Sequence, residues 1–481
     1  MAKLFGRATR RTNPAVSAAV AVRHALLASS ILAAGAVLLD ADRATAANLT
    51  EALAAAYNNN PTLLAERAQL RATDEGVPQA LSNWRPTVTV SGSYSFQNND
   101  LSGNTGGFSQ DTNIKLHPRT VGVNIAQPLY RGGRTVAQTA QAENLVEAER
   151  ARTVAVEQQV LSDSVTAYMD TLQAQAVLEL SINNEQVLRR QLEATQDRFR
   201  VGEVTRTDVA QAESRLASAS SDRITAEGTL ETSRATYQRV IGEPPGLLTA
   251  PAERPVLPTK RDEIIALAAS NNPNVVSAQF TEAAAREQVK VVRGQLLPTI
   301  SVVGSVQRGV DSSTSFRGLT ADSETIGAQL SVPLYEGGAI YSQTRQAQET
   351  VGQRRSQIDD ARRQVVQAAT QAYETVVANR AKIESLRIAI RSAEIALEGV
   401  QQEATVGSRT VLDILNAEQD LFTQRVNLVR AQHDEIVSEF QLVASVGRLT
   451  AIDLRLPVAL YDVDKHYQEV RNKWIGFDSS K

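Results

Sequence analysis

The feature that most constrains this fold is an internal duplication with a period of about 200 residues. Segments 201–213 (VGEVTRTDVAQAE) and 406–418 (VGSRTVLDILNAE) align without a gap. In each segment a helical pattern stops at a glycine, crosses a short polar turn and starts again as a helix. Glycine adopts the left-handed conformation of a helix C-cap without steric cost, and Thr205 and Thr410 suit the N-caps that follow. The period is too long for a solenoid, so it predicts two copies of one structural half.

Other motifs extend the duplication along the chain. N-N-P at 59–61 recurs at 271–273, and P-L-Y-x-G-G at 128–133 recurs at 333–338. The paired glycines in the second motif lack the Lys-Ser/Thr that follows a phosphate-binding loop, so we expect them to be hinges between a strand and a helix. These hinge residues are Gly132, Gly133, Gly337 and Gly338.

Residues 1–46 have the features of a secretory signal peptide. A basic start precedes an apolar run at 25–39 and the small-residue sequence Ala44-Thr45-Ala46. The alternative is a retained membrane anchor, for which the apolar run is short. The chain has no Cys, so it offers no disulfide, no thiolate metal site and no cysteine for lipidation. After residue 46 the chain is acidic, which argues against a nucleic-acid partner.

Two regions alternate apolar and polar residues with the period of a strand. In each region two strands flank a loop, and the loops are expected at 98–118 and 309–322. Each strand has roughly 9 to 12 residues, which is the length needed to cross a bilayer. Val88, Val90, Val302 and Leu330 are expected to face lipid, and Ser91 and Ser305 a water-filled lumen. Four strands cannot close a barrel, so the pattern calls for identical subunits. The alternative is a pair of hairpins in a soluble sandwich.

Long helices account for most of the remaining chain. Segments 134–200 and 339–405 contain no proline, and each would form a helix about 100 Å long. Returning helices are predicted at 205–241 and 410–446 and would pack on the first two as in a coiled coil. An earlier helix in the first half should break near Pro78, whereas its counterpart in the second half should not.

The chain resembles the TolC family of bacterial outer-membrane channel proteins. The resemblance rests on the order of its features: a signal peptide, the repeated N-N-P, P-L-Y-x-G-G and V-G-x-x-T motifs, and strands followed by long helices. The resemblance implies an α+β membrane protein in which four transmembrane strands per chain contribute to a trimeric β-barrel. It also implies a long antiparallel α-helical barrel in the periplasm. The implied partners are two further copies, a periplasmic adaptor, an inner-membrane transporter of the RND or ABC type, and outer-membrane lipid, with no cofactor. The implied function is an exit duct for drugs or secreted proteins.

The duplication and the resemblance together divide the chain into nine segments. They are a signal peptide (1–46), helices (47–85), a barrel hairpin (86–130) and a long helix pair (131–247) of the first repeat, a linker (248–259), then helices (260–297), a hairpin (298–335) and a helix pair (336–447) of the second repeat, and a C-terminal extended segment with a disordered tail (448–481). In the last segment we expect Trp474 and Ile475 to dock on the middle of the helices.

The resemblance assigns the two repeated turns to a gate at the periplasmic end. It implies that Arg409 bonds to Thr207 and Asp208 of a neighbouring helix pair, and that Asp413 supplies charge at the constriction. Asn416 stands where the family has a second acidic ring, and Ala404 where it has an aromatic residue. The alternative is that these charges only cap solvated helix ends, where Asp208 suits the dipole.

The same turns are expected to receive the adaptor. Val201, Gly202, Val406 and Gly407 would touch its hairpin tips, because glycine lets a partner backbone approach closely. The alternative is a plain helix C-cap, which by itself explains glycine at these positions.

The sequence contains no pattern typical of an enzyme. Its four histidines (His24, His117, His433 and His466) have no metal-ligand spacing, and it lacks a Walker A loop and a G-x-S-x-G motif. The alternative to an export channel is therefore a soluble periplasmic coiled-coil scaffold.

Overall fold

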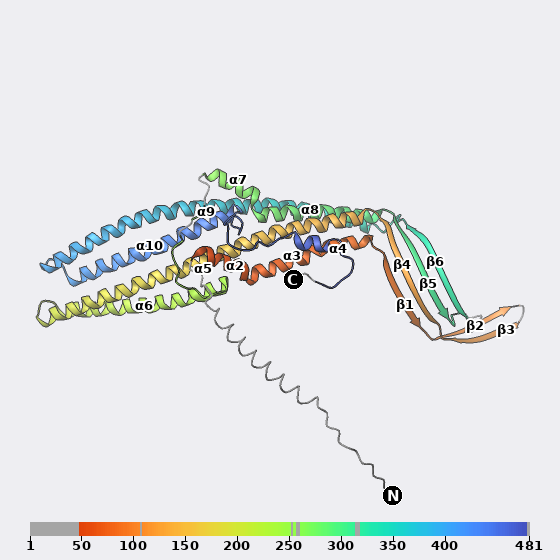
Figure 1. Ribbon diagram of the computed structural model, residues 1–481, viewed down its shortest axis with the longest axis horizontal. Helices are drawn as coiled ribbons and strands as arrows, with labels where there is room; N and C mark the ends of the chain where they lie inside the picture. The colour runs from red at the N-terminus through yellow and green to blue at the C-terminus, as the bar shows by residue number, and fades with distance from the viewer. Residues whose placement is uncertain (1–47, 106–107, 252–253, 256–259, 313–317, 479–481) are drawn as a thin grey trace, which may run out of the picture.

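The structure is a computed structural model, which describes residues 48–105, 108–251, 254–255, 260–312 and 318–478. The predicted signal peptide lies outside these ranges. The molecule is elongated, with a body of long helices, two helical tips at one end and a bent sheet at the other (Figure 1). Among the described residues, no helix combines the length and hydropathy of a transmembrane span.

Each repeat has the same order of helices, strands and long helix pair. The first contains α2 (Leu49–Asn59), α3 (Pro61–Asp74), α4 (Gly76–Leu81), η1 (Ser82–Trp84), β1 (Thr87–Tyr94), β2 (Gln97–Thr105), β3 (Phe108–Leu116), β4 (Arg119–Arg131), α5 (Arg134–Arg200) and α6 (Arg206–Ile241). The second contains α7 (Arg261–Asn271), α8 (Pro273–Arg293), η2 (Gly294–Leu296), β5 (Thr299–Val310), β6 (Thr320–Ser331), α9 (Ala339–Thr405) and α10 (Val411–Ser445), and is followed by α11 (Lys465–Val470). The predicted extents of both 67-residue helices are confirmed.

The repeated N-N-P motif has a structural role in each half. The Asn60 Oδ1 atom caps α3 by accepting from Thr62 N at 2.9 Å, while its Nδ2 atom donates to Val240 O on α6 at 2.8 Å. Asn272 does the same in the second half, with Nδ2 donating to Ser445 O at 3.0 Å. One asparagine thus starts a helix and ties it to the end of the returning helix, which explains why the motif occurs twice.

The four main strands form one antiparallel sheet in the order β1-β4-β5-β6. Its register pairs Val90 with Val123 and Val123 with Val306, so aliphatic residues from different strands share one face. Val88, Val90, Val302 and Leu330 all lie on that face, and Ser91 and Ser305 lie on the other, as predicted. Within the chain β1 and β6 are the two edges, and no described strand pairs with their outer sides.

The prediction of an exposed loop at 98–118 is wrong. Strands β2 and β3 pair as a separate antiparallel hairpin that projects beyond the main sheet (Figure 1). A hydrogen bond from Ser95 N to Pro118 O at 3.0 Å continues the pairing of β1 with β4 toward this hairpin. Its Asn, Ser and Gly composition hid the strands, because such a sequence does not alternate apolar and polar residues. The second loop is also shorter than predicted, since β5 continues to Val310 and β6 begins at Thr320.

The predicted break near Pro78 is confirmed. Helix α3 ends at Asp74 and α4 starts at Gly76, whereas the counterpart α8 runs unbroken for 21 residues. Proline removes one backbone donor and its ring crowds the preceding turn, so the helix divides just before it.

The main core joins the two repeats at the middle of the helical body. The Tyr168 ring on α5 and the Tyr237 ring on α6 are fully buried with centroids 6.3 Å apart, and Ile436 and Phe440 of α10 belong to the same cluster. The expectation that Trp474 and Ile475 dock there is wrong, because both side chains are exposed. Of the predicted disordered tail, residues 478–481, only Asp478 lies within the described residues.

Candidate functional site

The first repeated turn joins α5 to α6 at one helical tip. Gly202 has φ of +83°, and hydrogen bonds from Gly202 N to Phe199 O and from Glu203 N to Arg198 O close the last turn of α5. Thr205 then caps α6, where the Asp208 Oδ2 atom accepts from Thr205 N at 2.9 Å. Asp208 is therefore part of a capping box that fixes the start of the helix.

The second turn reproduces this geometry at the other tip. Gly407 has φ of +78°, Ser408 N donates to Glu403 O at 3.0 Å, and Thr410 caps α10. The Asp413 Oδ2 atom accepts from Thr410 N at 2.9 Å and from Thr410 Oγ1 at 2.8 Å. These hydrogen bonds lower the pKa of Asp413, so its charge persists below the usual range of a carboxylate.

Arg409 lies on the surface of the second turn, where its Nε atom is 2.8 Å from Glu403 Oε2. The hydrogen bond to Glu403 raises the pKa of Arg409. Both side chains are about half exposed, so the pair is weak and can exchange partners. Within one chain the structure thus places Arg409 with Glu403, while Asp208 and Thr207 belong to the other tip. Nothing in the sequence pattern singled out Glu403.

A contact between the two tips involves the residue that departs from the family pattern. Arg215 of α6 donates from Nη2 to Asn416 Oδ1 of α10 at 2.8 Å. Below this contact, apolar residues of α5, α6 and α10 form a small buried cluster. Ala404, five residues before Arg409, is also buried. The members of this tip cluster are Leu188, Ala212, Ala219, Val411 and Leu415. A neutral Asn416 therefore bonds an arginine within the chain, a link between positions 201 residues apart.

The predicted glycine hinges all have left-handed backbones. Gly133 and Gly338 are the N-caps of α5 and α9, with φ of +73° and +80°. A Cβ atom on Gly132 would lie 2.2 Å from Gly294 O, so only glycine fits where β4 passes the end of α8. No atom lies within 4 Å of a Cβ on Gly337, so there the backbone angle alone favours glycine.

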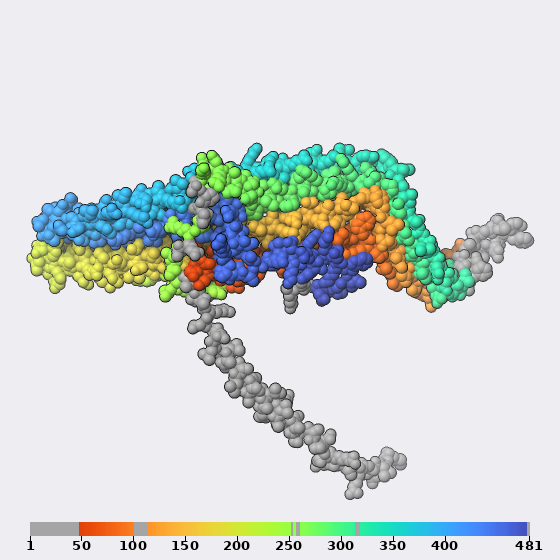
Figure 2. Space-filling view, turned by 45° about the horizontal axis from the view of Figure 1, so that its top comes forward, coloured from red at the N-terminus to blue at the C-terminus, as the bar shows by residue number. Residues whose placement is uncertain are grey.

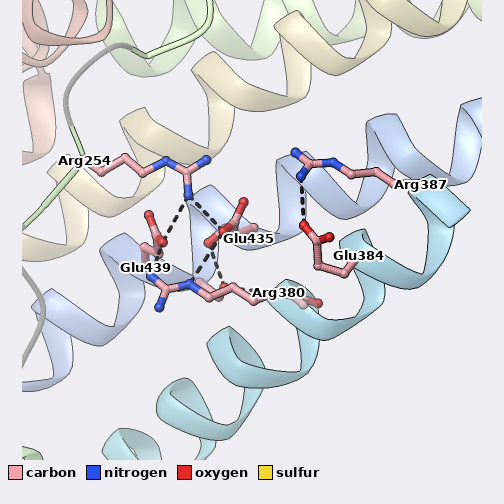
Figure 3. A network of polar contacts seen from close by, with 8 residues as sticks. Arg254, Arg380, Glu384, Arg387, Glu435 and Glu439 are labelled. Carbon is pink, nitrogen blue, oxygen red and sulfur yellow. Dashed lines mark hydrogen bonds and ion pairs between the residues drawn. The ribbon is translucent and has the colours of Figure 1, made fainter. Parts of the chain in front are cut away.

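An ion network near the middle of the body was not predicted. Arg254, from the segment between the repeats, has its Nη1 atom 2.8 Å from Glu435 Oε1 and 3.4 Å from Glu439 Oε1 of α10 (Figure 3). Arg380 of α9 approaches the same carboxylates, with Nη2 at 2.7 Å from Glu439 Oε1. Glu439 is only 1% exposed, so removing either arginine would leave a buried carboxylate with fewer partners. The network ties the connection between repeats to the second helix pair.

The two tips present charged and apolar side chains to solvent. The described residues contain no group of three or more His, Asp or Glu placed to hold a metal ion. The two capped turns instead present Val201 and Val406 as exposed side chains, and the second turn also carries Arg409 and Asp413.

Comparison with known proteins identifies relatives over nearly the whole chain. A family model described as outer membrane efflux protein matches residues 52–243 and 264–448. The chain is 36% identical over 451 residues to the outer membrane efflux protein BepC of Brucella suis, covering 94% of this chain and 96% of that protein. It is 27% identical to the outer membrane protein TolC of Vibrio cholerae, covering 85% and 92%. The solved Campylobacter jejuni CmeC outer membrane channel superposes with a TM-score of 0.74 at 16% identity, covering 88% and 89%.

Proposed function

The chain belongs to the outer membrane efflux protein family, and from this premise we propose that three copies of it form the exit duct of a tripartite export system. The protein is an outer-membrane channel component with a periplasmic helical part, and not an enzyme. In the proposed assembly a periplasmic adaptor and an inner-membrane transporter of the RND or ABC type deliver cargo, either small molecules or proteins, to the helical end.

The observation that carries the proposal is the four-stranded sheet with two different faces and two open edges. One face is aliphatic and the other is rich in Ser, Thr and Gly. An open edge in hydrocarbon leaves backbone groups unpaired, so β1 and β6 need partners. Four strands from each of three copies make twelve, enough to enclose a water-filled lumen.

The gate of this duct would lie at the helical tips. Arg409 is exposed and Asp413 is half-buried on the second tip, where three copies would bring them around one axis. Because the Arg409–Glu403 pair is weak, Arg409 can exchange Glu403 for Thr207 and Asp208 of a neighbouring copy when the tips approach. Three Asp413 carboxylates around the axis would then attract cations.

The adaptor would dock on the turns at Val201, Gly202, Val406 and Gly407. A Cβ atom on Gly202 or Gly407 would meet no atom within 4 Å, so added bulk there falls on a partner rather than on the chain. We expect Gly407→Trp to abolish export with trimers intact, while Gly407→Asn, which tolerates a left-handed backbone, retains export. Export by both variants at normal trimer level would show that docking lies elsewhere.

Planar-bilayer recording tests the proposed function as a whole. The purified full chain should migrate as a trimer that heat dissociates, and should insert with stepwise conductance. The Val302→Arg variant is the matched control, because it should lower trimer yield and conducting events together. A monomer that leaves the bilayer silent would contradict the proposal.

A further inference from the structure

The C-terminal segment beyond α10 climbs along the helical body toward the sheet. Tyr461 N donates to Tyr57 Oη of α2 at 3.1 Å, and the His466 Nδ1 atom lies 2.9 Å from Asp74 Oδ2 at the end of α3. Further on, Arg85 of the loop before β1 donates to Lys473 O at 2.8 Å. We call residues 461–478 the strap. Its successive partners on α2, α3 and the strand entrance show that it ascends.

Contacts with α5 give the same direction. Asp464 lies 2.6 Å from Arg150, and Arg471 lies 3.0 Å from Glu143. Helix α5 starts at Arg134, so Glu143 is only about 14 Å from the junction of strand and helix, and the strap continues past it. Figure 2 shows the strap in deep blue as a ridge that reaches toward the base of the strands.

The upper end of the strap carries three exposed apolar side chains. Trp474, Ile475 and Phe477 are 66%, 91% and 106% exposed. The Arg85 guanidinium lies 4.8 Å from the centroid of the Trp474 ring, which holds the ring at the entrance of β1. Earlier parts of the strap bury apolar and charged groups against the helices, with Val470 and His466 buried. Within the strap, exposed large apolar side chains are therefore confined to its end.

This end lies beside the end of the sheet that joins the helical body. The Trp84 carbonyl accepts from Gln127 Nε2 at 2.8 Å, which places Arg85 beside the periplasmic end of β4. On the same level Tyr130 pairs in register with Ile300, and Ile300 with Leu330, at the start of the aliphatic face. Aromatic residues with neighbouring Lys and Arg are typical of a membrane–water interface. The strap supplies both, through Trp474, Phe477 and Lys473.

From these contacts we infer that Trp474, Ile475 and Phe477 insert into the periplasmic leaflet of the outer membrane as an interfacial anchor. The ligand is a phospholipid surface, with the rings among the upper acyl chains and Arg85 and Lys473 at phosphate level. The occupant follows from continuity along the chain, because Trp474 packs on Arg85, two residues before β1, and Val88 and Val90 of β1 lie on the aliphatic face. The anchor would fix the height of the duct in the membrane, in addition to the barrel.

Tryptophan fluorescence tests this inference directly, because the chain contains only Trp84 and Trp474. The Trp84→Phe variant, purified as the full-length trimer and reconstituted in phosphatidylcholine vesicles, reports on Trp474 alone. Lipids brominated near the headgroup end of the acyl chains should quench it. The quenched fraction should be comparable to that of a lipid-facing control, in which both tryptophans are Phe and Val88→Trp is added. A water-facing control carries Ile452→Trp instead, at an exposed position in the segment after α10.

Three outcomes are distinct. Quenching by brominated lipid supports the anchor, and replacing Ile475 and Phe477 by Ser should then reduce that quenching. Quenching by aqueous acrylamide alone, as for the Ile452→Trp control, would place the strap in water and overturn the inference. Protection from both quenchers would show that another copy of the chain covers Trp474, which also overturns it. None of these outcomes bears on whether the trimer conducts.

Discussion

Helices α5 and α9 have the same length and the same start but opposite surroundings. Each runs for 67 residues from a left-handed glycine. Helix α5 has 21 buried residues because α6, α8 and α10 all pack on it, whereas α9 has eight and none between Ile383 and Ala404. In the left half of Figure 1, which ends in the tips, α9 and α6 form the two outer edges of the helical layer.

The difference shows that α5 occupies the interior of the chain's helical layer, whereas α9 lies at its rim. The rim of α9 is apolar in part, since Ile388 and Ile395 are 65% and 66% exposed and lie seven residues apart on one face. Strands β1 and β6 are the corresponding rims of the sheet. The helical layer and the sheet therefore each have two edges without a partner in the chain. A closed ring of identical copies requires such edges.

The largest effect is expected from charging the α9 rim. Replacing both Ile388 and Ile395 by Glu should abolish trimers, because unpaired carboxylates would be buried between helices of two copies. Ile452→Glu, at an equally exposed isoleucine outside the helical layer, should leave trimers intact. Native mass measurement of the detergent-solubilised protein distinguishes the two. Normal trimers in the double variant would mean that α9 faces solvent in the assembly.

The next effect separates the two faces of the sheet. Val302→Arg should cost about 2–4 kcal/mol of barrel stability where it meets the bilayer midplane, and Ser305→Arg much less, because Ser305 faces the lumen. The midpoint of trimer dissociation on heating measures the difference. Equal losses in both variants would refute the assignment of faces, although the register that places these residues on opposite faces would stand.

A smaller effect is expected at the tip of the second repeat. Arg409→Ser should raise single-channel conductance of the trimer, because it removes the proposed bond of Arg409 to Asp208 of a neighbouring copy. A loss of about 1.4 kcal/mol is enough to change the open-to-closed ratio tenfold. Asp413→Ala should instead relieve block by multivalent cations added from the periplasmic side. Arg200, on the tip of the first repeat, pairs with Asp197 in its own helix, so Arg200→Ser is the matched control and should conduct like wild type. Wild-type conductance of Arg409→Ser would reduce that residue to a solvated helix cap.

Part of this organisation could be predicted from the sequence. Helix lengths, sheet faces and the glycine turns followed from periodicity and from duplicated motifs such as N-N-P, because these features depend on neighbours in the chain. The pairs Arg215–Asn416 and Arg254–Glu435 could not be predicted, since they join positions 201 and 181 residues apart. The β2–β3 hairpin was missed because its polar strands lack alternation.

The smallest effect tests the packed interior. His433 of α10 bonds to Asp170 of α5 at 2.8 Å and to Asp434 at 3.0 Å, with Lys382 of α9 3.9 Å from Asp434. Burial opposes its charge, but the hydrogen bonds to both carboxylates prevail and raise the pKa of His433. The stabilisation is therefore complete below the unfolded pKa of about 6.5 and is lost as pH rises through the folded value.

His433→Gln should then cost about 1 kcal/mol at acidic pH and less at alkaline pH. Urea unfolding of the purified protein across this pH range measures the cost. A cost that is independent of pH would show that the imidazole is neutral in the folded protein.

The central claim, that the rims of one chain close on the rims of the next, is tested most directly by disulfide cross-linking between β1 and β6. The wild-type chain has no Cys, so the background is zero. Val90→Cys on β1 is combined in turn with a cysteine at Glu324, Ile326 or Ala328 on β6. The control pairs Val90→Cys with Val123→Cys, which are partners within one sheet. Oxidation should give covalent dimers and trimers for at least one β1–β6 pair and only monomers for the control. Monomers for all three β1–β6 pairs, with the control disulfide formed, would contradict the account.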